Sequence, residues 1–254
     1  MFMTPRAALL LFSATLLAGC VSTGAVDPMR TEQGRKEARE AYIQLGLGYL
    51  KQGRTDRAKV PLGKALELDP SDADAHAALA LVFQTELEPD LADRHYRKAL
   101  AERPGDARIL NNYGSFLFEQ RRYQDAYERF QQAAADTLYP ERARVYLNLG
   151  LAAIGLGRQD LAKAHLEKSL RINSQQPLTL LEMATLNFET RDYVAARSYY
   201  SSFSRMGEQS ARSLLLGTRL AKVFDDRDQA ATFGLQLKRL YPGTPEYQQY
   251  LSEQ

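Results

Sequence analysis

Residues 39–72 read REAYIQLGLGYLKQGRTDRAKVPLGKALELDPSD, and their spacing decides the fold. Counted from Arg39, small residues stand at positions 8 and 20, which are Gly46 and Ala58. Small side chains at these two places allow a pair of antiparallel helices to cross closely. Pro70, at position 32, ends the second helix because proline lacks an N–H group and clashes with the preceding turn. Larger side chains are expected to fill the space beside the crossing: Leu45, Tyr49 and Leu62.

This spacing is that of the tetratricopeptide repeat, a 34-residue helix–turn–helix unit. Further copies start near residues 73, 107, 143, 177 and 211. The segment 136–142 adds two residues before the fourth copy, and the fifth and sixth copies are degenerate. Because one unit cannot bury its own apolar face, neighbouring units must stack. The sequence therefore predicts an all-α superhelical solenoid of six repeats over residues 37–254, with a short C-terminal cap from Pro245 onward.

The composition argues against a nucleic-acid partner. The chain has 254 residues, with 33 basic and 31 acidic side chains. Such a balance gives no net field that would favour nucleic acid or an anionic membrane surface. The apolar fraction of 44% is ordinary for a soluble globular protein.

Nothing in the sequence predicts catalysis, a cofactor, a metal ion or a small-molecule substrate. The histidines His76, His95 and His165 stand at repeat positions 4, 23 and 23, and we interpret them as lying in different units. His76 is expected to be a partly buried core residue, and no cluster has the spacing of metal ligands. The acidic run 225–228 is interpreted as a solvated turn. The repeats leave no room for a catalytic domain, so we do not expect an enzyme.

Residues 1–19 have the features of an export signal. Arg6 precedes the apolar run 7–18, which is shorter than the roughly 20 residues that a membrane-spanning helix needs. Residues 20–36 are small and polar, with glycine and proline as breakers, and are interpreted as a flexible tether.

Residues 17–20, LAGC, resemble the bacterial lipobox. The resemblance implies that Cys20, the single cysteine of the chain, carries the lipid and becomes the mature N-terminus. Val21 follows where aspartate would indicate the inner membrane, which implies a lipid anchor on the periplasmic side of the outer membrane. The alternative is that Cys20 stands by chance near a cleavage site.

The first helix of each repeat lines the concave face, with positions 2, 5, 9, 12 and 13 pointing into it. An apolar stripe at these positions predicts a groove for an amphipathic or extended partner segment. The alternative is that the stripe packs against a neighbouring helix or the N-terminal segment. Positions 5 and 9 of the first repeat are not the lysine and asparagine with which chaperone-type repeats grip a peptide carboxylate. The candidate partner-binding residues are Ile43, Leu47, Leu50, Leu81 and Phe118.

Beyond the generic repeat pattern, residues 41–100 resemble the PilF/PilW family of outer-membrane lipoproteins, the pilotins of type IV pili. The similarity continues through TLYPER at 137–142, ARSLLLGTRLAKVF at 211–224 and LQLKRLYPG at 235–243. The resemblance implies that the protein helps to deliver the secretin subunit to the outer membrane and to assemble it there. The secretin is the multimeric channel through which the pilus passes.

One alternative keeps the same fold: a general scaffold lipoprotein of an outer-membrane protein assembly complex. Loss of such a scaffold would affect many β-barrels, whereas loss of a pilotin would affect piliation and twitching motility. We expect a monomer whose first repeat, nearest to the lipid anchor, meets the partner first.

Overall fold

The computed structural model describes residues 28–254, which form a stack of α-helices. A short 3₁₀ turn, η1 (Pro28–Arg30), precedes the stack, and the described residues contain no strand. The helices are α1 (Glu32–Lys51), α2 (Thr55–Leu68), α3 (Ala73–Thr85), α4 (Pro89–Glu102), α5 (Ala107–Glu119), α6 (Tyr123–Ala135), α7 (Arg142–Gly155), α8 (Gln159–Ile172), α9 (Pro177–Glu189), α10 (Tyr193–Ser204), α11 (Ala211–Val223), α12 (Arg227–Leu240) and α13 (Pro245–Ser252). Six helix pairs followed by one more helix confirm the predicted all-α solenoid.

The repeat boundaries follow the predicted register. Helices α3, α5, α9 and α11 begin at the residues where the second, third, fifth and sixth repeats were expected, and α7 begins one residue earlier than 143. The first helix is different, because α1 starts at Glu32, inside the segment 20–36 that was interpreted as a tether. Thr31 caps α1 by accepting a hydrogen bond from the backbone N–H of Gly34 at 3.0 Å. The predicted signal peptide 1–19 and Cys20 lie outside the described residues.

The small residues act at the helix crossings as the spacing predicted. A Cβ atom added to Gly46 would lie 2.5 Å from Cγ of Leu62. The same addition to Gly114 would meet the Phe130 ring at 2.6 Å, and one to Gly150 would meet Leu166 at 2.7 Å. Real Cβ atoms do not approach other atoms this closely, so each pair can pack at this distance only with glycine on its first helix.

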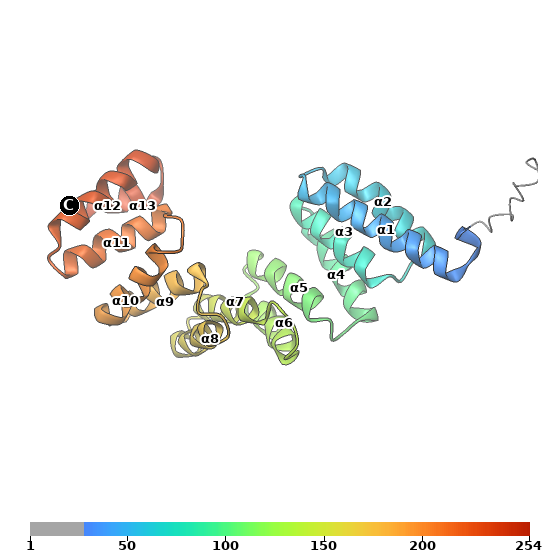
Figure 1. The fold of residues 1–254 in the computed structure, drawn as a ribbon, viewed down its shortest axis with the longest axis horizontal. Coiled ribbons are helices and arrows are strands. Elements are labelled where there is room, and N and C mark those ends of the chain that lie inside the picture. The colour runs from blue at the N-terminus through green and yellow to red at the C-terminus, as the bar shows by residue number, and fades with distance from the viewer. Residues whose placement is uncertain (1–27) are drawn as a thin grey trace, which may run out of the picture.

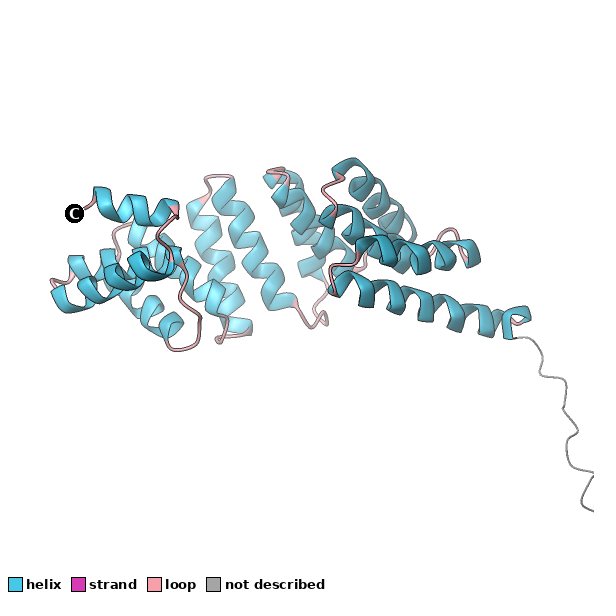
Figure 2. Cartoon of the chain, turned by 90° about the horizontal axis from the view of Figure 1, so that it is seen from above, coloured by secondary structure: helices cyan, strands magenta, loops and turns pink. Residues whose placement is uncertain are grey.

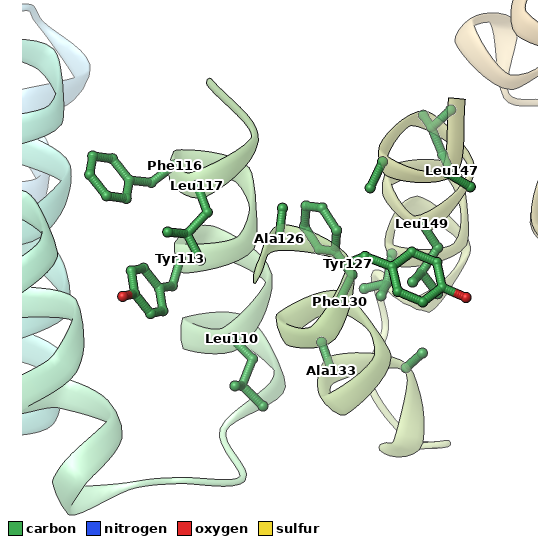
Figure 3. Packing of buried hydrophobic residues seen from close by; sticks show 14 of the residues in the cluster. Leu110, Tyr113, Phe116, Leu117, Ala126, Tyr127, Phe130, Ala133, Leu147 and Leu149 are labelled. Atoms are coloured by element: carbon green, nitrogen blue, oxygen red, sulfur yellow. The ribbon is translucent and has the colours of Figure 1, made fainter. Parts of the chain in front are cut away.

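One predicted core residue is exposed. Leu45, at position 7 of the first repeat, has 49% of its surface accessible, whereas Leu79, Tyr113, Leu149 and Met183 at the same position are at most 7% accessible. In the later repeats this side chain packs on the second helix of the preceding repeat. The Tyr113 ring, for example, lies 5.2 Å from the ring of Tyr96 on α4, and Figure 3 shows Tyr113 and Phe116 pointing away from α6. Among the described residues, Leu45 has no preceding repeat to pack on.

The repeats are arranged along an arc (Figure 1). In its middle, the first helices α5 and α7 lie on the inner side and the second helices α6 and α8 on the outer side. Figure 2 shows the helix pairs side by side, with α1 reaching beyond the other helices at its end of the stack. At the other end, α13 packs on α11 and α12 as the predicted cap, with Tyr247 and Tyr250 against the cluster that contains Leu214 and Leu237.

Candidate functional site

The concave side of the first three repeats carries a groove of about 260 Å³. Its residues come from α1, α3 and α5, the first helices of three consecutive repeats, which place repeat positions 2, 5 and 9 side by side. The groove is lined by Glu40, Ile43, Gln44, Leu47, Asp74, Ala78, Leu81 and Arg108.

The structure brings three of the five predicted groove residues together. Ile43, Leu47 and Leu81 line the groove, but only Leu47 and Leu81 are half-exposed, because Ile43 is 5% accessible and packs in the core between the first two repeats. Leu50 is half-buried against that same core and does not line the groove. Phe118 packs on the Tyr123 ring, with the ring centroids 5.2 Å apart, and it does not line the groove either. That the three lining residues bind a partner remains a prediction.

Charged side chains border the apolar part of the groove. Asp74 on α3 pairs with both Arg103 and Arg108, which fixes the Arg108 guanidinium at the groove's edge. Arg103 also reaches Asp106 at 3.3 Å. Asp74 and Arg108 remain 35% and 44% accessible, so both can exchange solvent for a partner's backbone groups. The sequence could have indicated these two charged residues, because both stand at position 2 of their repeats, which faces the concave side.

The concave face changes character beyond this groove. Gln84 donates a hydrogen bond to Glu119 at 2.6 Å and accepts one from the Tyr96 hydroxyl at 3.0 Å. Further along, the Asn148 amide donates to Asn111 at 2.9 Å. These side chains satisfy one another, so an apolar partner segment has more to gain in the groove of the first three repeats than over this polar stretch.

A second apolar surface on the first repeat was not predicted. Tyr42, Leu45 and Tyr49 of α1 and Val60 and Pro61 of α2 surround a hollow of about 320 Å³. It lies at the N-terminal end of the solenoid, called the open end here because no other repeat in the described residues 28–254 covers it. Val60 is 63% accessible, and the Lys64 ammonium lies 5.6 Å from the Tyr42 ring. The sequence contains one feature that could have indicated this surface, because Val60 is a large apolar residue at position 22 of its repeat. The other repeats have smaller or polar residues at this exposed position: Arg94, Glu128, Ala164, Ser198 and Thr232.

Two histidines that were interpreted as belonging to different units lie in the same repeat and touch. The Nδ1 atoms of His76 on α3 and His95 on α4 are 3.0 Å apart, and Nε2 of His76 is 3.0 Å from the Pro70 carbonyl oxygen. Because that oxygen can only accept, Nε2 of His76 carries the proton and its Nδ1 accepts from His95. Burial, with the neighbouring charges of His76, Lys98 and Arg94, lowers the pKa of His95 to about 4.

The described residues hold no group of three or more histidine, cysteine, aspartate or glutamate side chains arranged to bind a metal ion. None of the helices in residues 28–254 is long and apolar enough to cross a membrane.

Comparisons with known proteins agree with the repeat register. Models of the tetratricopeptide repeat family match residues 40–72 and 105–175. The type IV pilus assembly protein PilF of Pseudomonas aeruginosa is 61% identical over 251 residues, which cover 99% of this chain and all of the relative.

Solved structures extend the likeness to three dimensions. The structure of Pseudomonas aeruginosa PilF is 63% identical and superposes with a TM-score of 0.84, covering 87% of this chain and all of that one. The structure of PilW, described as a widely conserved type IV pilus biogenesis factor, is 29% identical with a TM-score of 0.76, covering 85% of this chain and 99% of that one.

Proposed function

This chain belongs to the PilF family of type IV pilus assembly proteins built from tetratricopeptide repeats, and from that premise we propose that it is a pilotin without enzymatic activity. In this proposal, lipid on Cys20 anchors the protein to the periplasmic side of the outer membrane. The solenoid binds a secretin subunit and promotes its localisation and multimerisation there, as pilus assembly and twitching motility require. The 61% identity to PilF along essentially the whole chain carries the proposal.

The groove of the first repeats offers a physical basis for binding a secretin monomer. Secretin subunits assemble into a multimeric channel, so a lone subunit exposes surface that its neighbours later cover. Leu47 and Leu81 provide half-exposed apolar contacts, while Asp74 and Arg108 border them with polar groups. Such a groove can shield an apolar or strand-edge segment until contacts between secretin subunits replace it.

The anchor provides the second part of the mechanism. Each acyl CH₂ group buried in a bilayer contributes about 0.8 kcal/mol, so several chains on Cys20 would hold the protein stably on the membrane. A secretin subunit bound to the solenoid would then be concentrated at the same surface.

The groove is tested by Leu47→Glu and Leu81→Glu, measured as binding of purified secretin subunits and as secretin multimers in the outer-membrane fraction. A buried carboxylate next to an apolar partner should weaken capture by about tenfold or more. Leu151→Glu is the matched control, because Leu151 is also half-buried at position 9 but lies in the fourth repeat. Circular dichroism should show that all three variants remain helical.

Two outcomes would move the site. If both groove variants capture secretin normally while Leu45→Glu does not, the binding surface is the hollow at the open end. If Leu151→Glu impairs capture as strongly as the groove variants, binding is spread along the concave face.

The anchor is tested by Cys20→Ala. We expect secretin to be present in this strain but mislocalised or monomeric, as judged by membrane fractionation and gel electrophoresis of unheated samples. Normal multimers in the outer membrane would contradict delivery by the lipoprotein. A general assembly scaffold is the alternative, and it predicts that deleting the protein lowers the levels of many outer-membrane β-barrels.

A further inference from the structure

A second groove lies between the second helices of repeats 2 and 3, α4 and α6, above α5. It has a volume of about 440 Å³, which is within the size range of small-ligand sites. Half-buried Leu100 supplies the apolar surface of the floor, and Tyr113 and Leu117 lie almost fully buried beneath it. The remaining lining residues are Arg97, Ala101, Arg122, Asp125 and Arg129.

Three arginines surround this apolar floor, and two carboxylates hold two of them in place. Asp93 accepts from Arg97 at 2.6 Å and from the Tyr113 hydroxyl at 2.7 Å, and lies 3.5 Å from Arg122. Asp125 pairs with Arg122 at 2.6 Å.

Arg129 is the least engaged of the three. In the described part of the chain it forms no ion pair, and its guanidinium donates to Gln132 at 3.1 Å. Arg97 keeps 64% of its side chain accessible despite its pair with Asp93. These two guanidinium groups, one on α4 and one on α6, can therefore each receive a carboxylate.

The repeat architecture supplies four internal controls for this groove. At the junction of repeats 2 and 3, position 25 of one repeat and positions 16 and 23 of the next line the same groove. At the junction of repeats 2 and 3 these positions are all arginine: Arg97, Arg122 and Arg129. At the other four junctions they are Gly63, Glu88 and His95; Gln131, Arg158 and His165; Glu167, Asp192 and Tyr199; and Ser201, Asp226 and Phe233. No other junction carries more than one arginine, so the shared repeat fold does not require this cluster.

We propose that this groove is a second protein-binding surface, which takes a short acidic segment of a partner polypeptide. Two carboxylates of the segment pair with Arg97 and Arg129, and an apolar side chain between them lies on Leu100. An arginine guanidinium can donate two parallel hydrogen bonds to one carboxylate, so the contact depends on orientation as well as on charge.

The chemistry of the groove favours a polypeptide over a more highly charged ligand. Asp93 and Asp125 offset much of the positive charge, so a phosphate group or a nucleic-acid backbone would meet two carboxylates as well as three guanidinium groups. The apolar floor would stay uncovered beneath such a ligand. A segment that alternates acidic and apolar side chains satisfies both parts of the groove.

This surface is separate from the concave groove of the proposed function. The concave groove is lined by the first helices α1, α3 and α5, whereas the arginines stand on α4, on α6 and at the residue that precedes α6. No residue lines both grooves, so the two surfaces can be tested independently.

The test uses a fluorescein-labelled hexapeptide of alternating glutamate and leucine, and the same peptide with glutamine in place of glutamate, with the purified soluble chain from residue 21 onward. The glutamate peptide should bind at least about tenfold more tightly in fluorescence anisotropy. Its binding should weaken as salt is raised. It should also shift the methyl NMR signals of Leu100 and Leu117.

Variants then locate the contact. Arg97→Gln with Arg129→Gln should reduce the affinity for the glutamate peptide by about tenfold or more, and Arg129→Lys should reduce it less, because lysine keeps the charge but loses the fork. Arg158→Gln, at position 16 of the next junction, is the matched control and should leave the affinity unchanged. Thermal unfolding shows that each variant is folded.

Three results would overturn the proposal. One is equal binding of the glutamate and glutamine peptides. Another is an affinity that Arg158→Gln reduces as much as the double variant does. The third is full displacement of the peptide by inorganic phosphate at millimolar concentration or by vesicles of anionic lipid, which would assign the cluster to phosphate groups.

Discussion

The two ends of the solenoid are built differently. At the C-terminal end, α13 covers the last pair: the hydroxyl end of Tyr250 lies against Gly234, and Glu253 accepts hydrogen bonds from Arg219 at 3.1 and 2.5 Å. At the N-terminal end, Leu45 and Val60 are 49% and 63% accessible in the described chain. A terminal repeat normally needs a polar outer face or a cap. One end of this molecule is closed by its own chain, whereas the described part of the other end leaves apolar side chains accessible.

The difference teaches that a neighbour, not the residue type, decides whether position 7 stabilises the fold. The largest predicted effect comes from Leu149→Gln, since Leu149 is 1% accessible and packs against the preceding repeat. We expect a loss of about 3–5 kcal/mol in chemical denaturation. Leu45→Gln, the same change at the open end, should cost less than about 0.5 kcal/mol. Similar losses in both variants would show that the open end is covered in solution.

Glycine-to-alanine substitutions at the two ends should destabilise different parts of the solenoid. Gly46→Ala sets a Cβ against Leu62 between α1 and α2 and should cost about 1–3 kcal/mol, because neither helix can move without opening the core. Gly234→Ala meets the Tyr250 hydroxyl instead and should release α13 while the rest of the stack stays folded. Hydrogen exchange of the two variants would distinguish these effects.

The control for both glycine variants is Gly48→Ala in α1. An added Cβ at Gly48 meets no atom within 4 Å, so this variant should be about 0.5–1 kcal/mol more stable. A destabilised Gly48→Ala protein would mean that helix α1 is constrained by something other than its packing on α2.

Mild acid should loosen the N-terminal half before the C-terminal half. His95 has a folded-state pKa near 4, against about 6.5 in the unfolded chain. The unfolded state therefore binds the proton first, and stability falls as the pH drops below 6.5, by at most about 2 kcal/mol at pH 5. Repeats 5 and 6 contain no histidine.

Hydrogen exchange at pH 6.5 and 5 should show protection lost in α3 and α4 first, and His95→Gln should reduce that loss. Equal loosening of α11 and α12 would contradict the assignment to the histidine pair.

A small effect is predicted for the ion pair at the closed end. Arg219 holds the pKa of Glu253 below its ordinary value, and both side chains are about one-third accessible. Glu253→Gln should therefore weaken the docking of α13 by about 0.5–1 kcal/mol. The measurement is the hydrogen exchange of the backbone amides of α13, which reports how far the helix frays. Arg227→Gln is the control, because its pair with Asp225 is more than 80% accessible and should contribute nothing measurable. Equal fraying in both variants would mean that the ion pair does not hold the helix.

The candidate groove could be predicted only in part. Repeat position placed Leu47 and Leu81 on the concave face, and both line the groove. The same rule gave Leu50 and Phe118, which pack against neighbouring side chains instead. Position within a repeat fixes the direction in which a side chain leaves its helix. It does not state how closely the next helix approaches, and that distance decides which side chains stay accessible.

The sequence by itself determined the number of repeats and their register, because these depend on residue types at short, regular spacings. The close crossing at Gly46 could be read in this way, since only glycine fits against Leu62. The tertiary structure decided what depends on neighbours. It exposed Leu45, joined His76 to His95, and gathered Arg97, Arg122 and Arg129 around one groove. These properties arise where separate helices meet, and the distances between helices are set by packing rather than by the local pattern.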